Sequence, residues 1–155
     1  MSVKDALSNS RPKGEVEMEI LVALDQTTLA PTVLAKAVEV AKREGASLTI
    51  LCVAEVFQDF GDYFDAAALS DKLLEGVKTA AEGYKAQAQK LGLTPKLVVE
   101  SGVSPADLIV DKAEKIKADL IIMGTRGKKG MDRFLTGSVA AAVAGHAPCS
   151  VLVLR

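Results

Sequence analysis

With 155 residues, of which 49% are hydrophobic, the chain has the size and composition of one domain with its own core. Its 19 basic and 20 acidic side chains nearly cancel, so no overall field would attract nucleic acid or an anionic membrane, and we expect neither as a partner. No apolar run approaches the roughly 20 residues of a membrane span, and the first residues are polar, so we expect a cytoplasmic protein.

The predicted elements alternate in kind along the chain. Residues 1–17 are polar and lack periodicity, which predicts a flexible N-terminal extension ahead of a single domain at 18–155. The expected strands are 20–25, 47–56, 96–100, 119–123 and 150–154. The expected helices are 29–44, a second one carrying a stripe of apolar residues between 69 and 91, a third at 105–117 and a short one at 137–145.

Local signals support these boundaries. Gly45 follows the first helix where a left-handed cap is common, and Ser104 before Pro105 is typical of an N-cap followed by proline at the first helical position. The second helix repeats apolar residues three or four apart, and we expect this stripe to pack into the core. Its members are Leu69, Leu73, Val77, Tyr84, Ala88 and Leu91. Strands joined by helical crossovers predict an α/β fold, an open parallel sheet with helices on both faces.

Cysteine and histidine offer no metal cluster. Cys52 and Cys149 lie in apolar strand-like runs without metal-ligand spacing, and we expect both to act as small buried hydrophobic residues. The single histidine, His146, follows Gly145 at a helix C-terminus, where an imidazole commonly contacts the last carbonyls. We therefore expect no acid-base role for it. Asp59, Asp62 and Asp65 lack the spacing of a calcium loop and suit a solvated connector.

The segment after the fourth strand carries the functional signal. Gly124 and Gly127 bracket a turn, and after nine residues Gly137 and Ser138 open the last helix. Glycine permits positive φ and close backbone approach to a ligand, and the first amides of a helix attract anions. This segment contains one acidic residue and four basic ones: Arg126, Lys128, Lys129 and Arg133. The pattern suits a polyphosphate; the alternative is a solvated surface loop.

The spacing Gly124-x2-Gly127-x9-Gly137-Ser138 resembles the signature of the universal stress protein family, in its ATP-binding branch. Further segments match in order from residue 19 to 155: 20–25 and 48–53 resemble the first two strands of the family, and 102–105, 118–124 and 146–153 its later segments. Two departures occur, at 26–28 after the first strand and at Ser150, where proline is common. The resemblance implies a Rossmann-like sheet, as in adenine nucleotide alpha hydrolases, with strand order 3-2-1-4-5. The ligand crevice then lies between the carboxyl ends of strands one and four.

The resemblance also implies the residues that bind the nucleotide. They are Leu24, Asp25, Val53, Met123, Gly124, Arg126, Gly127, Gly137, Ser138 and Val139. Val53 matches the position whose main chain recognises adenine, and Ser138 would donate to a phosphate. For Asp25 two roles are open: it holds ribose hydroxyls or a divalent cation (Mg or Mn) beside the phosphates, or it only caps a turn with residues 26–28.

The function implied is a dimeric regulator of the stress response that binds ATP, or AMP or ADP, and acts through protein clients that the sequence does not identify. The alternative is a dimeric interaction module of the same fold without a nucleotide. Enzymatic turnover is at most slow ATP hydrolysis, because the chain has no Walker lysine motif and no evident water-positioning residue. The apolar last strand would lie at the sheet edge, and we expect two copies to pair through residues 150–155.

Overall fold

The computed structural model describes residues 17–56, 66–125 and 137–155. Its elements are β1 (Glu19–Leu24), α2 (Ala30–Glu44), β2 (Ser47–Glu55), α3 (Ala66–Lys90), β3 (Lys96–Gly102), α4 (Pro105–Lys115), β4 (Leu120–Gly124), α5 (Ser138–His146) and β5 (Ser150–Leu154). The expected strands begin and end within two residues of the observed ones. Most of the expected N-terminal extension and the acidic connector with Asp59, Asp62 and Asp65 lie outside the described residues.

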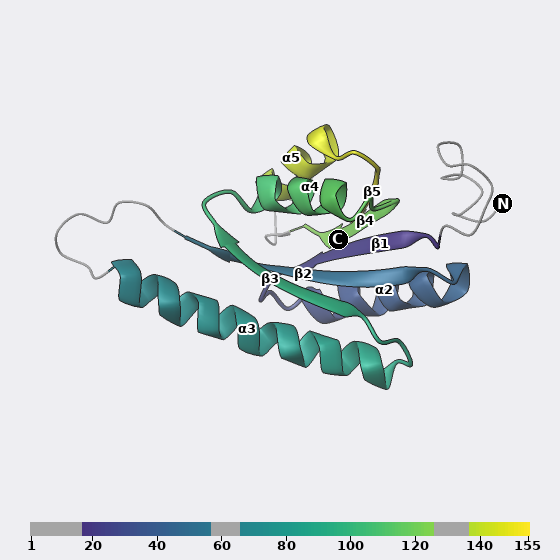
Figure 1. Cartoon of the computed structure of the whole chain (residues 1–155), viewed down its shortest axis with the longest axis horizontal. Coiled ribbons are helices and arrows are strands. Elements are labelled where there is room, and N and C mark those ends of the chain that lie inside the picture. Colours follow the sequence, from purple (N-terminus) through teal and green to yellow (C-terminus); the bar gives the residue numbers. More distant parts are fainter. Residues whose placement is uncertain (1–16, 57–65, 126–136) are drawn as a thin grey trace.

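The strands form one five-stranded parallel sheet in the order β3-β2-β1-β4-β5. This order confirms the α/β fold and the strand arrangement that the family resemblance implied. β1 lies in the middle, with Ile20 beside Leu48 of β2 and Leu120 of β4. The chain winds outward from β1 to β3 and then returns to the other side through β4 and β5 (Figure 1).

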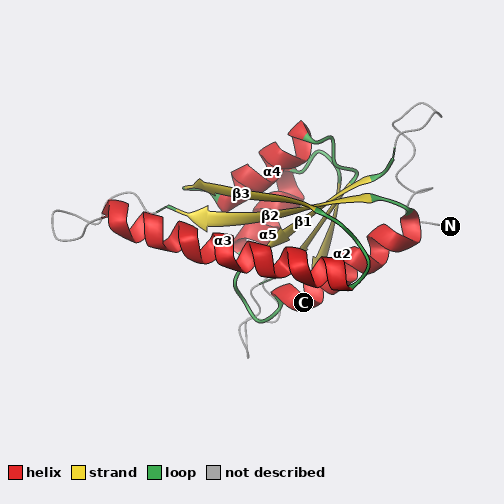
Figure 2. Cartoon of the chain, turned by 60° about the horizontal axis from the view of Figure 1, so that its bottom comes forward, coloured by secondary structure: helices red, strands yellow, loops and turns green. Residues whose placement is uncertain are grey.

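Alternate residues of the central strands supply two separate cores. Ile20 and Val22 of β1 pack with α2 and α3 on one face, whereas Leu21 packs with α4 and α5 on the other. All three side chains are fully buried. Figures 1 and 2 show the two pairs of helices on opposite faces of the sheet. Burial on both faces explains why the strands read as continuous apolar runs.

The predicted helix caps are present. Gly45 ends α2 in the left-handed region with φ 60°, and its amide donates to the Ala41 carbonyl. Ser104 is the N-cap of α4, where its hydroxyl accepts a hydrogen bond from the amide of Asp107 at 3.3 Å. The two caps lie at opposite edges of the sheet, because Gly45 precedes the start of β2 and Ser104 follows the end of β3.

The expectation for α3 is wrong at its ends. Ala88 is buried and Tyr84 is half-buried, but Leu69, Leu73 and, just past the helix, Leu91 are 42%, 37% and 41% exposed. The reason is length. The 25 residues of α3 span about 37 Å at the usual helical rise, whereas the nine residues of β2 span about 30 Å. The helix therefore overhangs the strands that it covers (Figure 2).

Within the described ranges, the helices are all too short or too polar to cross a membrane.

Candidate functional site

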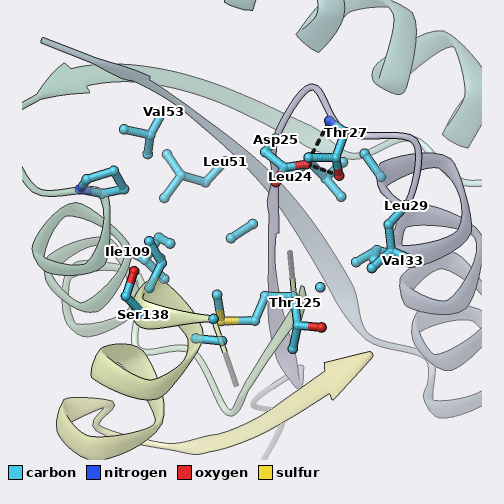
Figure 3. Close-up of a pocket in the computed structure, with 18 of the residues that line it drawn as sticks. Leu24, Asp25, Thr27, Leu29, Val33, Leu51, Val53, Ile109, Thr125 and Ser138 are labelled. Atoms are coloured by element: carbon cyan, nitrogen blue, oxygen red, sulfur yellow. Dashed lines mark hydrogen bonds between the residues drawn. The ribbon is translucent and has the colours of Figure 1, made fainter. Parts of the chain in front are cut away.

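A cavity of about 230 Å³ opens at the carboxyl ends of β1 and β4, where the strand order reverses (Figure 3). Eight of the predicted site residues line it: Leu24, Asp25, Val53, Met123, Gly124, Gly137, Ser138 and Val139. They come from β1, β2, β4 and α5, which are far apart in the sequence. The other two, Arg126 and Gly127, lie outside the described residues, as do Lys128, Lys129 and Arg133.

Asp25 follows the last residue of β1 and caps the next turn. Its Oδ1 accepts hydrogen bonds from the amide of Thr27 at 2.9 Å and from the Thr27 hydroxyl at 2.6 Å. The expected cap of this turn by Asp25 is therefore present. The same carboxylate also lines the cavity, so capping orients a charged acceptor at its rim (Figure 3).

A tyrosine distant in the sequence holds the same residue through its main chain. The Tyr84 hydroxyl, on α3, donates a hydrogen bond of 2.6 Å to the carbonyl oxygen of Asp25. The two residues are 59 positions apart. Sequence reasoning placed Tyr84 only in an apolar stripe, and no local pattern could have indicated its hydroxyl partner.

The two described glycines of the site do not have the positive φ that was expected of them. Neither Gly124 nor Gly137 has positive φ; Gly137 is extended at φ −51° and ψ 147°. At Gly124 the constraint is space, because a Cβ there would lie 2.8 Å from Leu29 Cδ2 and 3.1 Å from Val33 Cγ2. The expected use of positive φ is therefore wrong at both positions. Glycine at 124 instead lets the first turn of α2 approach the end of β4.

The N-terminus of α5 faces the cavity. Gly137 is the N-cap of this helix and makes no side-chain hydrogen bond. The first hydrogen bond of the helix runs from the Ala141 amide to the Gly137 carbonyl, at 2.9 Å. The amides of Ser138, Val139 and Ala140 precede that bond, and the first amides of a helix have no partner inside it. All three residues line the cavity. The helix dipole places partial positive charge at this end, which suits an anion.

Apolar side chains make up much of the remaining wall, and carboxylates are the charged groups on its described part. Leu51 and Val53 of β2 and Ile109 of α4 face the cavity (Figure 3). Glu55, the last residue of β2, also lines it. Glu55 was not predicted as a site residue, although its position two residues after Val53 in a strand puts both side chains on one face. The described lining carries Asp25 and Glu55 and holds neither lysine nor arginine.

Among the described residues, no group of three or more His, Cys, Asp or Glu side chains could hold a metal ion. Asp25 alone would need other oxygen ligands to bind a cation.

Neither the two cysteines nor the histidine belongs to a metal-binding group of described residues. Burial, and next the charge of Asp25, raises the pKa of the Cys52 thiol to about 12. Cys149 is only half-buried, and burial followed by the charge of Asp119 raises its pKa to about 11. His146 contacts the Ala142 carbonyl through Nδ1 at 2.9 Å, which confirms the helix-end interaction expected for it.

Comparisons with known proteins agree with this fold. The family model described as the universal stress protein family matches residues 18–155. A relative in Staphylococcus haemolyticus that carries the universal stress protein name is 37% identical over 140 residues, covering 88% of this chain and 83% of the relative. The structure of universal stress protein UspA from Lactobacillus plantarum is 29% identical with a TM-score of 0.76, covering 92% of this chain and 100% of that one.

A universal stress protein from Archaeoglobus fulgidus, solved in complex with dAMP, is 25% identical with a TM-score of 0.65, covering 90% of this chain and 99% of that one. The family match spans nearly the whole chain, and the shared strand order agrees with it. The chain belongs to the universal stress protein family.

Proposed function

We propose that the protein binds an adenine nucleotide, ATP or else AMP or ADP, in the cavity between β1 and β4, and acts as a nucleotide-dependent regulator in the stress response. One observation carries the proposal. The ends of three strands and the N-terminus of α5 converge on one cavity, and they bring hydroxyls, two carboxylates and the first amides of a helix to its wall. Groups of these kinds suit the phosphates, the ribose and the base of a nucleotide.

The phosphates belong at the N-terminus of α5. Amides of the first turn and the Ser138 hydroxyl donate there, and the helix dipole adds partial positive charge. The predicted loop residues Arg126 and Gly127 connect β4 to this helix in the sequence and complete the proposed phosphate site. The adenosine part lies toward β1 and β2, with the ribose near Asp25 and the base against the apolar wall around Val53.

A divalent cation, Mg or Mn, would reduce the repulsion between the carboxylates of the site and the phosphates. The described wall carries two carboxylates, Asp25 and Glu55, which repel a polyphosphate. A cation between Asp25 and the phosphates removes that repulsion, and the phosphate oxygens supply the ligands that the protein alone lacks. A carboxylate at the rim of an anion site is the donor that Mg²⁺ prefers, so Asp25 fits the ion.

The relative from Archaeoglobus fulgidus, at 25% identity over 90% of this chain, supports the proposal because it was solved with dAMP. We propose binding rather than turnover as the function. The sequence has no Walker lysine motif, and any hydrolysis of ATP would be slow. Protein clients would then distinguish the loaded from the empty protein.

A homodimer through the last strand is part of the proposal. β5 is the terminal strand of the sheet, and its apolar residues Val151 to Leu154 are only half-buried. Antiparallel pairing with the same strand of a second copy would cover both edges at once.

We also propose that 18–155 fold as a single domain without 1–17. A chain lacking residues 1–17 should then keep the melting temperature and nucleotide affinity of the full chain.

Calorimetric titration of the full chain with ATP and Mg²⁺ tests the function. We expect saturable binding, with adenine nucleotide found by mass spectrometry in the supernatant of denatured protein. Asp25→Ala is the site variant and Thr79→Val the matched control, because the Thr79 hydroxyl donates inside α3, to the Glu75 carbonyl at 3.0 Å. A flat titration of folded wild-type protein would exclude nucleotide binding and leave the dimeric interaction module as the function.

A further inference from the structure

Asp25 is held from two sides by hydrogen bonds of different origin. Its side chain accepts from Thr27 within the turn, whereas its main-chain carbonyl accepts from the Tyr84 hydroxyl at 2.6 Å. We propose that Tyr84 is a positioning residue for nucleotide binding, which fixes the Asp25 peptide and so aims the Asp25 carboxylate into the cavity. This inference rests on the proposed function of the site.

The Tyr84 ring is well placed to act as an anchor. It is half-buried and packs against the core between the sheet and the helices α2 and α3. The helix that carries it also approaches the turn elsewhere, since Gly76 lies close to the Gln26 side chain. A ring fixed by packing holds its hydroxyl in place at little entropic cost, so the hydrogen bond to Asp25 is preorganised.

Asp25 also borders a second cavity. This cavity, of about 390 Å³, lies beneath α3 and is lined by Leu24, Asp25 and Tyr84 among others. The two cavities adjoin at the end of β1, since both are lined by Leu24 and Asp25, but only the second is lined by residues of α3. Asp25 therefore borders open space on the α3 side, and the Tyr84 hydroxyl reaches it there. The position of α3 on the sheet thus affects the geometry of the proposed nucleotide site.

The hydroxyl remains a donor across the physiological range. Burial, and then the neighbouring Cys52 and Asp25, raises the pKa of Tyr84 above its ordinary value. The neutral phenol can donate to a carbonyl, whereas a phenolate could not.

The test combines Tyr84→Phe with Asp25→Ala in a double-mutant cycle, measured as the calorimetric Kd for ATP with Mg²⁺. Tyr84→Phe keeps the ring and removes only the hydroxyl, and we expect roughly threefold to tenfold weaker binding, the usual range for one neutral hydrogen bond. Thr79→Val deletes a hydroxyl from the same helix away from the site, and its Kd should equal that of the wild type. In the Asp25→Ala background, Tyr84→Phe should change the Kd no further, because the carboxylate to be positioned is gone.

The outcomes separate the two hypotheses. If the wild type binds no nucleotide, the proposed function fails; if the wild type binds and Tyr84→Phe binds equally well, only the role of Tyr84 fails. An equal loss in both backgrounds would also overturn that role, since Tyr84 would then act without Asp25. Melting temperatures check that every variant is folded at the titration temperature. Should Tyr84→Phe unfold, Tyr84→Trp keeps an aromatic anchor that cannot place a donor at the same point, and the same comparison decides.

Discussion

Gly124 and Leu29 lie so close that a single added carbon would bring them into collision. A Cβ on Gly124 would fall 2.8 Å from Leu29 Cδ2, and the buried Val33 side chain would be 3.1 Å away on the same helix. The glycine at the end of β4 is therefore required by the packing of α2, and both elements line the cavity at this point. The shape of the site and the stability of the fold depend on the same missing side chain.

Gly124→Ala should consequently destabilise the protein. Leu29 can rotate away, but Val33 is β-branched and stiff, so α2 must shift or the core must strain. We expect the free energy of unfolding in urea to fall by about 1–2 kcal/mol, a typical cost of overpacking. Gly83→Ala is the control, since nothing lies within 4 Å of a Cβ there and α3 should gain about 0.5–1 kcal/mol in helix propensity. A Gly124→Ala variant as stable as the wild type would show that α2 adapts freely.

Sequence patterns predicted the fold because the apolar runs and the helix caps all agreed with an alternating α/β order. The apolar runs of the central strands, Gly45 at φ 60° and the Ser104 N-cap all occupy the expected places. Overhang of α3 was not predictable from periodicity. A stripe such as Leu69 and Leu73 reports a helical face but not how much sheet lies beneath that face.

The candidate site was predicted where it is built from strand ends and a helix start, since topology alone brings these together. Long-range contacts of single side chains escaped prediction. The Tyr84 hydroxyl on the Asp25 carbonyl depends on how α3 lies over β1, and Glu55 reaches the cavity only because β2 extends past Val53. The reason for glycine at 124 was also missed, because the side chains of Leu29 and Val33 that forbid a Cβ belong to another element.

Asp25→Asn should show whether the Asp25 carboxylate holds a divalent cation. Asparagine keeps an oxygen that can accept from the Thr27 amide and hydroxyl, so the turn should survive, but the charge that would hold a cation is lost. We expect the gain in ATP affinity on adding Mg²⁺, compared with ATP in a chelator, to fall by about tenfold, as for loss of one charged partner. Asp25→Ala is the comparison that also removes the turn bonds. An unchanged Mg²⁺ effect in Asp25→Asn would exclude the carboxylate as a ligand of the cation.

Stability should decline in alkaline solution through Cys52. Its pKa is raised to about 12 in the folded protein, chiefly by burial, whereas an unfolded thiol titrates near 8.5–9. Above about pH 9 the unfolded chain therefore binds fewer protons than the folded one, and the free energy of unfolding falls as pH rises, by at most about 1.4 kcal/mol per unit. Cys149, whose pKa is raised to about 11, adds a similar loss in both proteins. Between pH 8 and 10 we therefore expect the wild type to lose about 1–2 kcal/mol more stability in urea unfolding than Cys52→Ala. Parallel curves for the two proteins would contradict a shifted thiol.

The geometry of β5 allows the proposed dimer edge to be blocked without disturbing the sheet. The Leu154 carbonyl accepts from the Thr125 amide at 2.8 Å, so the polar main-chain groups of Leu154 face β4. Because these groups alternate along a strand, those of Val153 face the outer edge. Proline at that position removes an outward N–H and leaves the ladder to β4 intact, as proline does on natural edge strands.

Val153→Pro should therefore sediment as a monomer, whereas the wild type should sediment at twice the monomer mass. Proline also keeps an apolar ring against the α4 and α5 core, which Val153 contacts, so folding should survive. Val153→Thr is the matched control, because it has nearly the same shape and retains the N–H, and it should remain dimeric. If Val153→Pro folds and still sediments with the wild type, pairing through β5 is excluded and the dimer, where present, uses another surface. Antiparallel pairing predicts this result because proline removes an outward N–H donor from each of the two paired strands.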